Sequence, residues 1–311
     1  MIIATHSGKF HADDVWAVAV LDLIFPGSEL VRTRDAKVIE AADFAVDVGG
    51  IWDPDSGRFD HHQKGFQGAR PSGVVYASAG LVWKAYGPRC VSLLAGQRTG
   101  CSLSPEQARE IASAIDSDLV QYLDMSDTGA AKNAPGGYGL SAVVSGFNPG
   151  WLDDQAAGSA QAADAQRLTR FRRAMEFVAD IIGNGVAYRV GAMLAVQQVR
   201  QSERLEGGRV LFLENAALPW AGIVRNEMAD VLFVISHSLA DQRYMIHTVP
   251  TSSDTFEARK DLPTSWAGLQ GEGLATATGV PDAVFCHNNL FIAACKSYEG
   301  IREMARQALA A

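Results

Sequence analysis

The order of apolar segments in the first 50 residues is the feature that most constrains the fold. A β-prone run at residues 2–5 is followed by a helical pattern over about 13–25, which a Pro-Gly pair ends. Two further apolar runs, residues 30–33 and 44–48, have the length of strands. Strand, helix, strand in this order predicts a mostly parallel sheet flanked by helices, and therefore an α/β fold for the N-terminal part.

Two helices are expected next along the chain. A helical pattern covers residues 78–86, and a Gly-Pro pair directly after it predicts its end. A second helix should begin at Ser104-Pro105, because serine is a favourable N-cap and proline fits the first helical position. The apolar face of this second helix includes Ile115, and Asp116 lies at its edge.

The second half of the chain differs from the first in composition and in its pattern of expected helices and strands. Residues 146–160 are rich in Gly, Asn, Pro and Ala, and a long amphipathic helix is expected over about 163–182. Short β segments follow, the first at residues 186–190, and a helix over 298–310 closes the chain. We therefore expect an N-terminal domain over residues 1–150, a linker and connecting helix over 151–185, and a C-terminal, substrate-binding α+β domain over 186–311.

Composition limits the function classes. The chain has 311 residues, of which 48% are hydrophobic and 20% charged, as in ordinary globular proteins. No apolar run approaches the roughly 20 residues of a membrane span, and no signal-peptide pattern opens the chain, so we expect a cytoplasmic protein without membrane contact. The net charge of −8 argues against a protein that coats nucleic acid, although an enzyme with a locally basic channel stays open.

Histidine and aspartate are concentrated in four short segments of the first half. His6 and Asp47 directly follow predicted strands, and in an open parallel sheet ligands bind at the carboxyl ends of the strands. Separate segments could therefore converge on one cleft. The candidate metal ligands in these segments are His6, His11, Asp13, Asp47, His61 and Asp116.

The chemistry of this set points to a hydrolytic metal site. Imidazole and carboxylate without thiolate suit Mn²⁺, Fe²⁺ or Zn²⁺, and Mg²⁺ is a further alternative. The set is larger than one catalytic ion needs, since such an ion keeps a position open for water. Two ions that share a bridging carboxylate would use all of the ligands and could catalyse a phosphoryl displacement. By contrast, the chain has no GxxxxGK[ST] loop, no GxGxxG fingerprint and no Gly-x-Ser-x-Gly elbow.

The ordered motifs resemble the DHH phosphoesterase superfamily, which includes pyrophosphatases, single-strand exonucleases and oligonucleotide phosphatases. Within it the chain is most similar to the Myg (melanocyte proliferating gene) branch of metal-dependent hydrolases, one of whose eukaryotic members is described as a 3′→5′ RNA exonuclease. The motifs that carry this resemblance are Thr5-His6-Ser7-Gly8-Lys9-Phe10-His11-Ala12-Asp13-Asp14, Val46-Asp47-Val48-Gly49-Gly50, Phe59-Asp60-His61-His62-Gln63 and Leu262-Pro263-xx-Trp266. It implies a DHH-type N-terminal domain.

Two departures from the superfamily pattern concern the predicted site. Relatives commonly space the first motif as His-xxx-Asp-x-Asp, whereas His11 and Asp13 stand one position further on. The fourth motif of the Myg branch tends towards Ile-Asp-Asn-Gly, and here Asp116 is followed by Ser117 and Asp118. The first departure could change the preferred metal, and the second could change the turn after the ligand.

The resemblance also implies a role for each residue. His6 and His11 would hold one ion, Asp13 and Asp116 the other, and Asp47 would bridge the two. His61 would complete the second site. Asp60 would orient a neighbouring histidine, and His62 would stabilise or protonate the leaving oxygen.

Substrate binding should come from cations, because the transferred phosphoryl group is anionic. Candidates in the second half are Arg259, Lys260 and Lys296, with Arg259 first because a guanidinium binds phosphate bidentately. A solvated surface position is the alternative for all of them.

The ligand set predicts a two-metal phosphodiesterase that uses two divalent ions, Mn²⁺ first. The resemblance to the Myg branch implies that it acts on RNA or short oligonucleotides with 3′→5′ polarity. One alternative is a phosphohydrolase that acts on pyrophosphate or nucleotides. Another is a non-catalytic nucleic-acid-binding protein with a vestigial site. A homodimer is left open.

Overall fold

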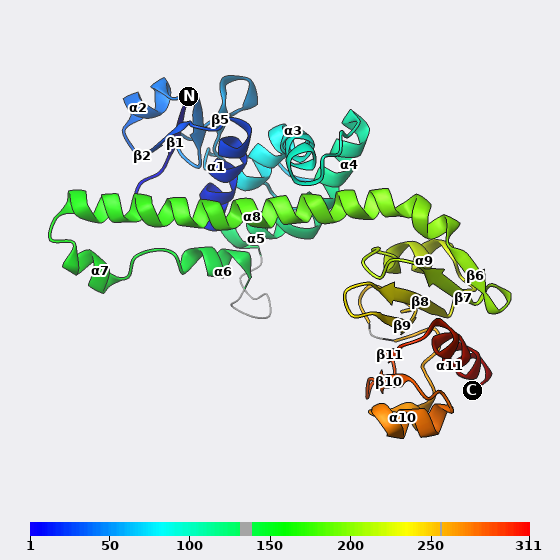
Figure 1. Ribbon diagram of the computed structural model, residues 1–311. Helices are drawn as coiled ribbons and strands as arrows, with labels where there is room; N and C mark the ends of the chain where they lie inside the picture. The colour runs from blue at the N-terminus through cyan, green and yellow to red at the C-terminus, as the bar shows by residue number, and fades with distance from the viewer. Residues whose placement is uncertain (131–138, 256) are drawn as a thin grey trace. The chain divides into compact units, whose positions relative to one another are not determined.

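The computed structural model describes residues 1–130, 139–255 and 257–311, which form two compact units, residues 1–190 and 191–311 (Figure 1). The division falls inside a single helix, α8 (Ala160–Gln201). The segment predicted as linker and connecting helix, residues 151–185, therefore belongs to the first unit. No helix in the described part of the chain has an apolar stretch long enough to cross a membrane.

The first unit contains a five-stranded sheet with the order β2-β1-β3-β5-β4. β1 pairs in parallel with β2 and with β3, β3 pairs in parallel with β5, and only β4 runs antiparallel to its neighbour. The predicted α/β class and mostly parallel sheet are confirmed for this unit. The strands are β1 (Ile2–Thr5), β2 (Glu29–Arg32), β3 (Phe44–Val46), β4 (Trp52–Asp53) and β5 (Arg58–Phe59).

Helices surround this sheet and enclose one large apolar core, in which Trp16 packs edge-on against Trp83 at 5.7 Å between ring centroids. The helices of the first unit, besides α8, are α1 (Ala12–Ile24), α2 (Ala36–Ala41), α3 (Ser78–Thr99), α4 (Pro105–Ile115), the π-helical turn η2 (Asp116–Val120), α5 (Gln121–Asp127), α6 (Leu140–Ser145) and α7 (Trp151–Ala156). A single 3₁₀ turn, η1 (Pro54–Ser56), joins β4 to β5.

Helix α3 continues past the Gly-Pro pair at which the sequence predicted its end. Proline removes one backbone hydrogen bond from a helix and usually kinks or ends it. Here Cys90, Val91 and Leu94, beyond the proline, are buried in the core, and their burial offsets the lost bond. The helix ends instead at Gly100, whose φ of 69° is left-handed.

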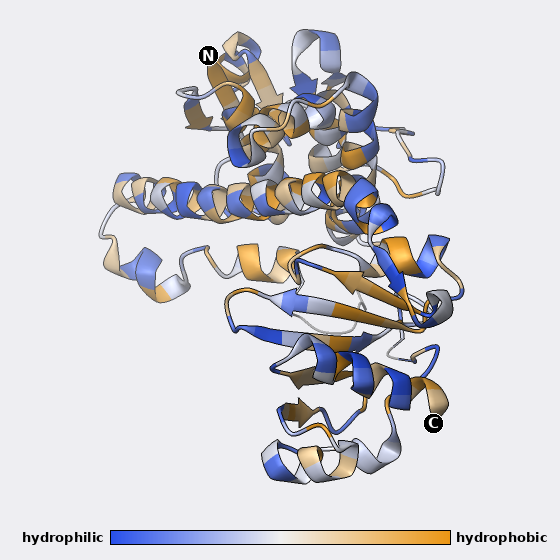
Figure 2. Cartoon of the chain, turned by 45° about the vertical axis from the view of Figure 1, so that its right-hand side comes forward, coloured by the Kyte–Doolittle hydropathy of each residue, from blue (hydrophilic) through white to orange (hydrophobic). Residues whose placement is uncertain are grey.

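Helix α8 is also longer than predicted, and the strand expected at residues 186–190 lies within it. Its buried residues recur every three or four positions from Phe171 through Ile182 to Val190, so one apolar stripe runs along the helix. Figure 2 shows this alternation of polar and apolar colour along α8. Two glycines at 183 and 185 cost about 1 kcal/mol each in a helix, and the buried stripe outweighs that cost.

The second unit is a six-stranded mixed sheet with the order β10-β11-β9-β8-β7-β6, in which β7 and β8 are the parallel pair. Helix α11 packs against one face, where Phe233, Ile246 and Met304 share a core, and α9 belongs to a second core around Val224 and Val234. The elements are β6 (Glu203–Leu205), η3 (Glu206–Gly208), β7 (Val210–Leu213), α9 (Ala221–Glu227), β8 (Phe233–Ser238), β9 (Arg243–Thr248), η4 (Thr264–Trp266), α10 (Gly271–Thr278), β10 (Ala283–Cys286), β11 (Ile292–Cys295) and α11 (Tyr298–Ala310).

The imidazole of His247 on β9 makes the stability of this unit depend on pH. Burial lowers the pKa of His247 from 6.5 to about 4. Below pH 6.5 the unfolded chain therefore binds a proton that the folded chain does not, so stability falls as the pH falls through this window. The gap corresponds to at most about 3 kcal/mol, and because the residue is only partly buried in the fold we expect about 1–2 kcal/mol.

Urea unfolding at about pH 7 and about pH 4.5 checks this expectation. Wild type should lose about 1–2 kcal/mol more stability between the two conditions than His247→Gln, which cannot take up the proton. Equal losses in the two proteins would show that His247 does not contribute to the pH dependence.

Candidate metal centre

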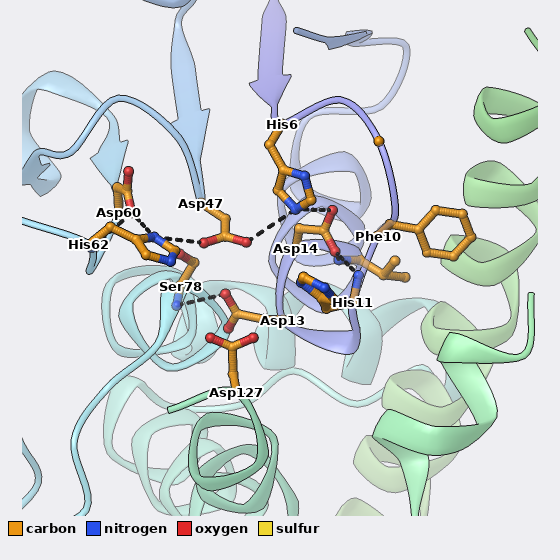
Figure 3. A network of polar contacts seen from close by, with 12 residues as sticks. His6, Phe10, His11, Asp13, Asp14, Asp47, Asp60, His62, Ser78 and Asp127 are labelled. Carbon is orange, nitrogen blue, oxygen red and sulfur yellow. Dashed lines mark hydrogen bonds and ion pairs between the residues drawn. The ribbon is translucent and has the colours of Figure 1, made fainter. Parts of the chain in front are cut away.

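Three neighbouring parallel strands deliver their next residues to one edge of the N-terminal sheet. His6 follows β1, Asp47 follows β3, and the Asp60-His61-His62 segment follows β5 (Figure 3). Because these strands are parallel and adjacent, their carboxyl ends lie side by side. Asp47 adopts a left-handed φ of 55°, an uncommon conformation that typically needs support from its surroundings.

Helix α1 brings two further carboxylates to the same place from its first turn. Asp14 accepts a hydrogen bond from the backbone amide of His11 at 2.8 Å and so helps to cap its own helix. Asp13 is buried and accepts hydrogen bonds from the backbone amides of Ser78 at 3.1 Å and Ala79 at 2.6 Å. The N-terminus of α3 therefore fixes the orientation of the Asp13 carboxylate.

The two carboxylate oxygens of Asp47 face different histidines. Oδ2 lies 3.4 Å from Nε2 of His6, and Oδ1 lies 3.6 Å from Nε2 of His61. The same two ring nitrogens each face one more carboxylate, Asp14 at 3.3 Å from Nε2 of His6 and Asp127 at 3.2 Å from Nε2 of His61. Asp47 is thus the central group of a chain of alternating carboxylates and imidazoles.

Ligand atoms gather in three overlapping groups, in each of which they lie within 4.8 Å of one another. Asp47 belongs to two of the groups and His61 to two. The groups are His6, His11 and Asp47; Asp47, His61 and His62; and Asp13, His61 and Asp127. The structure therefore brings together five of the six predicted ligands, all except Asp116.

Asp116, the sixth predicted ligand, belongs to none of these three groups, and its role as a ligand stays a prediction. Its carboxylate accepts two hydrogen bonds from Arg70, at 2.7 Å from Nε and 2.6 Å from Nη2. The residue at the cluster is Asp127, at the end of α5. Asp116 and Asp127 are eleven residues apart in one run of helix. This spacing corresponds to about three turns, so the two aspartates lie on the same face of the helix but roughly 16 Å apart along its axis.

Several atoms of the cluster are buried without a hydrogen-bond partner among the described residues. They are Nε2 of His6, Nε2 of His61, Oδ1 of Asp47 and Oδ2 of Asp14. Buried polar atoms are rarely left unpaired, because desolvation without a partner is costly. Donor atoms of this kind suit divalent cations, so the residues present fit the predicted metal ions.

The pKa values of the cluster reflect a surplus of buried negative charge. Burial, reinforced by the nearby Asp47 carboxylate, raises the pKa of Asp13, and burial raises that of Asp14 to about 7. Burial alone would lower the pKa of His61, but the carboxylates of Asp127 and Asp47 outweigh it and raise the value to about 10. The cluster therefore binds positive charge strongly, whether as protons or as cations.

His62 differs from the other histidines because its side chain is 62% exposed. Asp60 holds it, with Oδ1 accepting from the ring Nδ1 at 2.8 Å and from the backbone amide at 3.0 Å. The second oxygen of Asp60 accepts from the amide of Gly50 at 2.6 Å. This contact places the Nδ1 proton towards Asp60 and leaves Nε2 as the ring nitrogen that can exchange a proton.

A cleft of about 500 Å³ opens beside the cluster. Arg34, from the loop after β2, lines it. Four of the metal-ligand candidates also line the cleft, together with Asp60 and His62: His6, His11, Asp47 and Asp127. Sequence reasoning missed Arg34, although its position directly after a predicted parallel strand was a usable signal.

The cations predicted to bind substrate have other contacts. Arg259 donates to the backbone carbonyls of Met228, at 2.7 Å, and of Val231 and Arg225, at 2.8 Å each. Its guanidinium therefore holds the segment around α9 in place, and its predicted role in binding phosphate stays a prediction. Lys260 donates to the carbonyl of Leu309 at 3.4 Å. Lys296 is exposed in the second unit, and its predicted role stays a prediction.

A buried ion pair between Arg70 and Asp124 stabilises the helices that hold two of the candidate metal ligands. Arg70 contacts Asp124 at 2.6 Å, and Asp124 accepts from the backbone amide of Gly80 at 3.0 Å. Asp124 lies one turn before Asp127 in α5, and Gly80 lies in the first turn of α3, which holds Asp13. The pair thus ties together two of the backbone segments that carry or orient ligands.

This contact explains why position 80 is glycine. A Cβ there would overlap the Asp124 carboxylate and would lie 2.8 Å from Nη2 of Arg70. We expect Gly80→Ala to destabilise the protein by about 2–3 kcal/mol, because the buried pair must separate. The matched control is Gly96→Ala, in the same helix but facing open space, which should stabilise by about 0.5–1 kcal/mol.

Urea unfolding of the two variants measures both effects. A Gly80→Ala protein as stable as wild type would mean that Asp124 and Arg70 can move apart at little cost. The free energy of unfolding should fall in Gly80→Ala and rise in Gly96→Ala. This difference separates the effect of close packing at position 80 from the general preference of helices for alanine over glycine.

Comparison with known proteins adds the family. A family model described as "Uncharacterised protein family (UPF0160)" matches residues 2–309. The chain is 30% identical over 337 residues to the MYG1 protein of Caenorhabditis elegans, with 99% of this chain and 95% of that protein covered. It is 30% identical over 337 residues to the human MYG1 exonuclease, with 99% of this chain and 85% of that protein covered. Since both matches span nearly the whole chain, it belongs to the MYG1 (UPF0160) family.

Proposed function

We propose that this protein is a phosphoesterase dependent on two divalent metal ions, which removes nucleotides from the 3′ end of RNA or short oligonucleotides. The observation that carries the proposal is the position of Asp47, whose two oxygens face His6 and His61 separately. A carboxylate in this position can bridge two ions. The exonuclease names of the human, rat and mouse relatives support the reaction class, and the order of the motifs supports a place in the DHH superfamily.

The ligand groups suggest how the residues would divide between the ions. His6, His11 and Asp47 would hold one ion, and Asp13, His61 and Asp127 would hold the other, with Asp47 shared. Mixed imidazole and carboxylate ligands favour Mn²⁺, with Fe²⁺, Zn²⁺ and Mg²⁺ as alternatives. When bound, two such ions stabilise the charge on the phosphoryl oxygens and lower the pKa of an attacking water.

His62 would handle the proton of the leaving oxygen. Its Nδ1–H donates to Asp60, so a protonated His62 carries its second proton on Nε2, at the exposed end of the ring. That proton can pass to the leaving alkoxide as the P–O bond breaks. Asp60 would keep the ring oriented, as the aspartate of a catalytic triad does.

A second candidate function is hydrolysis of a small phosphate compound such as a nucleotide or pyrophosphate. The cleft volume of about 500 Å³ favours it, because a site of this size can enclose one nucleotide. The net charge of −8 also gives no general attraction for a long polyanion.

A substrate panel tests the proposal. Wild type and His62→Gln would be given 5′-labelled single-stranded RNA and DNA, dinucleotides and pyrophosphate, with Mn²⁺ or with a chelator. We expect stepwise shortening of RNA from its 3′ end that requires Mn²⁺, slowed about 100-fold in His62→Gln. Cleavage of pyrophosphate or nucleotides alone would favour the second candidate. The proposal fails if wild type with Mn²⁺ cleaves no member of the panel.

A further inference from the structure

The cleft beside the metal centre contains one arginine that the proposed function has not used. Arg34 is exposed and lines the cleft together with His6, His11, Asp47, Asp60, His62 and Asp127. Three of these neighbours are aspartates. Asp60 is held by hydrogen bonds and is not among the proposed metal ligands, so its negative charge stays in the cleft, where a cation beside it would favour entry of a phosphate.

The backbone of Arg34 is held in a fixed position relative to the metal centre. The amide of Thr33 donates to the carbonyl of Thr5 at 2.8 Å, so this loop is tied to the residue before His6. The hydroxyl of Thr33 accepts from the amide of Asp35 at 3.0 Å, and Asp35 caps α2 by accepting from the amide of Lys37 at 2.9 Å. Arg34 therefore projects from an anchored turn, which limits the entropy lost when it binds a ligand.

Neighbouring arginines are committed to other contacts, whereas Arg34 is not. Arg32 donates to the carbonyl of Gly8 at 2.9 Å, and Arg58 donates to two carbonyls in the α2 segment at 3.0 Å each. Across the described residues, no carboxylate lies within 4 Å of the guanidinium of Arg34, so it does not form an ion pair there. A free guanidinium beside a metal centre has the geometry to bind phosphate oxygens bidentately.

We propose that Arg34 binds a phosphate group of the substrate beside the metal centre. This inference rests on the proposed phosphoesterase function. It assigns the role to an arginine on the sheet that carries the ligands, rather than to Arg259. The ligand class is a phosphate monoester or diester anion.

The test compares wild type with Arg34→Gln, Arg34→Lys and the control Lys37→Gln, all as full-length Mn²⁺-loaded protein. Lys37 is exposed on α2 and does not line the cleft. Binding of adenosine 5′-monophosphate is measured by calorimetry, bound Mn²⁺ by elemental analysis, and hydrolysis of a labelled RNA oligonucleotide by steady-state kinetics. We expect Arg34→Gln to weaken nucleotide binding and raise KM about 10- to 100-fold. Bound Mn²⁺ should stay unchanged.

The two substitutions at position 34 and the control distinguish the contribution of the positive charge to nucleotide binding from that of the planar guanidinium. Arg34→Lys keeps the charge but loses the planar fork, so its affinity should fall between wild type and Arg34→Gln. Lys37→Gln should match wild type in every measurement.

The outcomes distinguish this inference from the proposed function. If Arg34→Gln binds the nucleotide as tightly as wild type, or if it loses Mn²⁺, the inference is overturned even when wild type cleaves RNA. If wild type binds the nucleotide through Arg34 but cleaves no phosphoester, the phosphate site stands and the proposed function fails. Absence of nucleotide binding by wild type would also overturn the inference.

Discussion

Asp47→Asn is expected to lower the rate of Mn²⁺-dependent hydrolysis by about 1,000-fold or more. Mutation of a residue that only hydrogen-bonds to a metal ligand already costs about 10- to 100-fold in metal affinity or activity, and Asp47 is itself a proposed ligand. Asp47 is the carboxylate that contacts both His6 and His61, so its loss affects both proposed ions at once. An amide oxygen carries no net charge and cannot bridge two cations as a carboxylate does. The number of bound Mn²⁺ ions should therefore fall together with the rate.

The matched control for this prediction is Asp55→Asn, an exposed aspartate in the turn between β4 and β5. It removes the same charge from the same unit without touching the cluster. Rates and elemental analysis should leave Asp55→Asn indistinguishable from wild type. If Asp47→Asn kept both its Mn²⁺ content and its activity, Asp47 could not be the bridging ligand.

Asp127→Asn and Asp116→Asn are expected to differ sharply in activity, by about 100-fold or more. Asp127 contacts His61 at 3.2 Å and belongs to a ligand group, whereas Asp116 is paired with Arg70. Loss of Asp127 should release one of two bound ions. Asp116→Asn should leave both ions bound and lower stability by about 1–2 kcal/mol, because Arg70 loses one of its two hydrogen bonds and the charge of its partner.

Elemental analysis, hydrolysis rates and urea unfolding of the two variants check this contrast. The pair is its own control, since both substitutions neutralise an aspartate in the same run of helix. An Asp116→Asn protein that lost an ion while Asp127→Asn kept both would reinstate the ligand set predicted from sequence.

The strands and the candidate ligands at their ends could be proposed from the sequence because each signal is local. His6 and Asp47 directly follow short apolar runs, and the parallel order of the strands is implied by the helix between them. The helix start at Ser104-Pro105 and the closing helix over Tyr298–Ala310 were predicted for the same reason. Such features depend on residues within a few positions of one another.

The features that sequence reasoning missed depend on distant contacts. Asp127 reaches the cluster because α4 continues through a π-helical turn into α5. Asp116 pairs instead with Arg70, which lies 46 residues earlier in the chain. The contacts of Arg259 with carbonyls about 30 residues away are equally invisible in sequence. In α3 and α8, burial against the core overrides local proline and glycine signals.

The central claim is that the chain holds two divalent ions around Asp47, and counting the ions tests it most directly. Wild-type protein would be dialysed to equilibrium against Mn²⁺ at about neutral pH, where imidazole ligands compete well with protons, and the bound metal measured against protein concentration. We predict two tightly bound Mn²⁺ ions per chain, and a marked loss of both in Asp47→Asn. Binding of no ion, or of one ion that Asp47→Asn retains, would contradict the two-metal account.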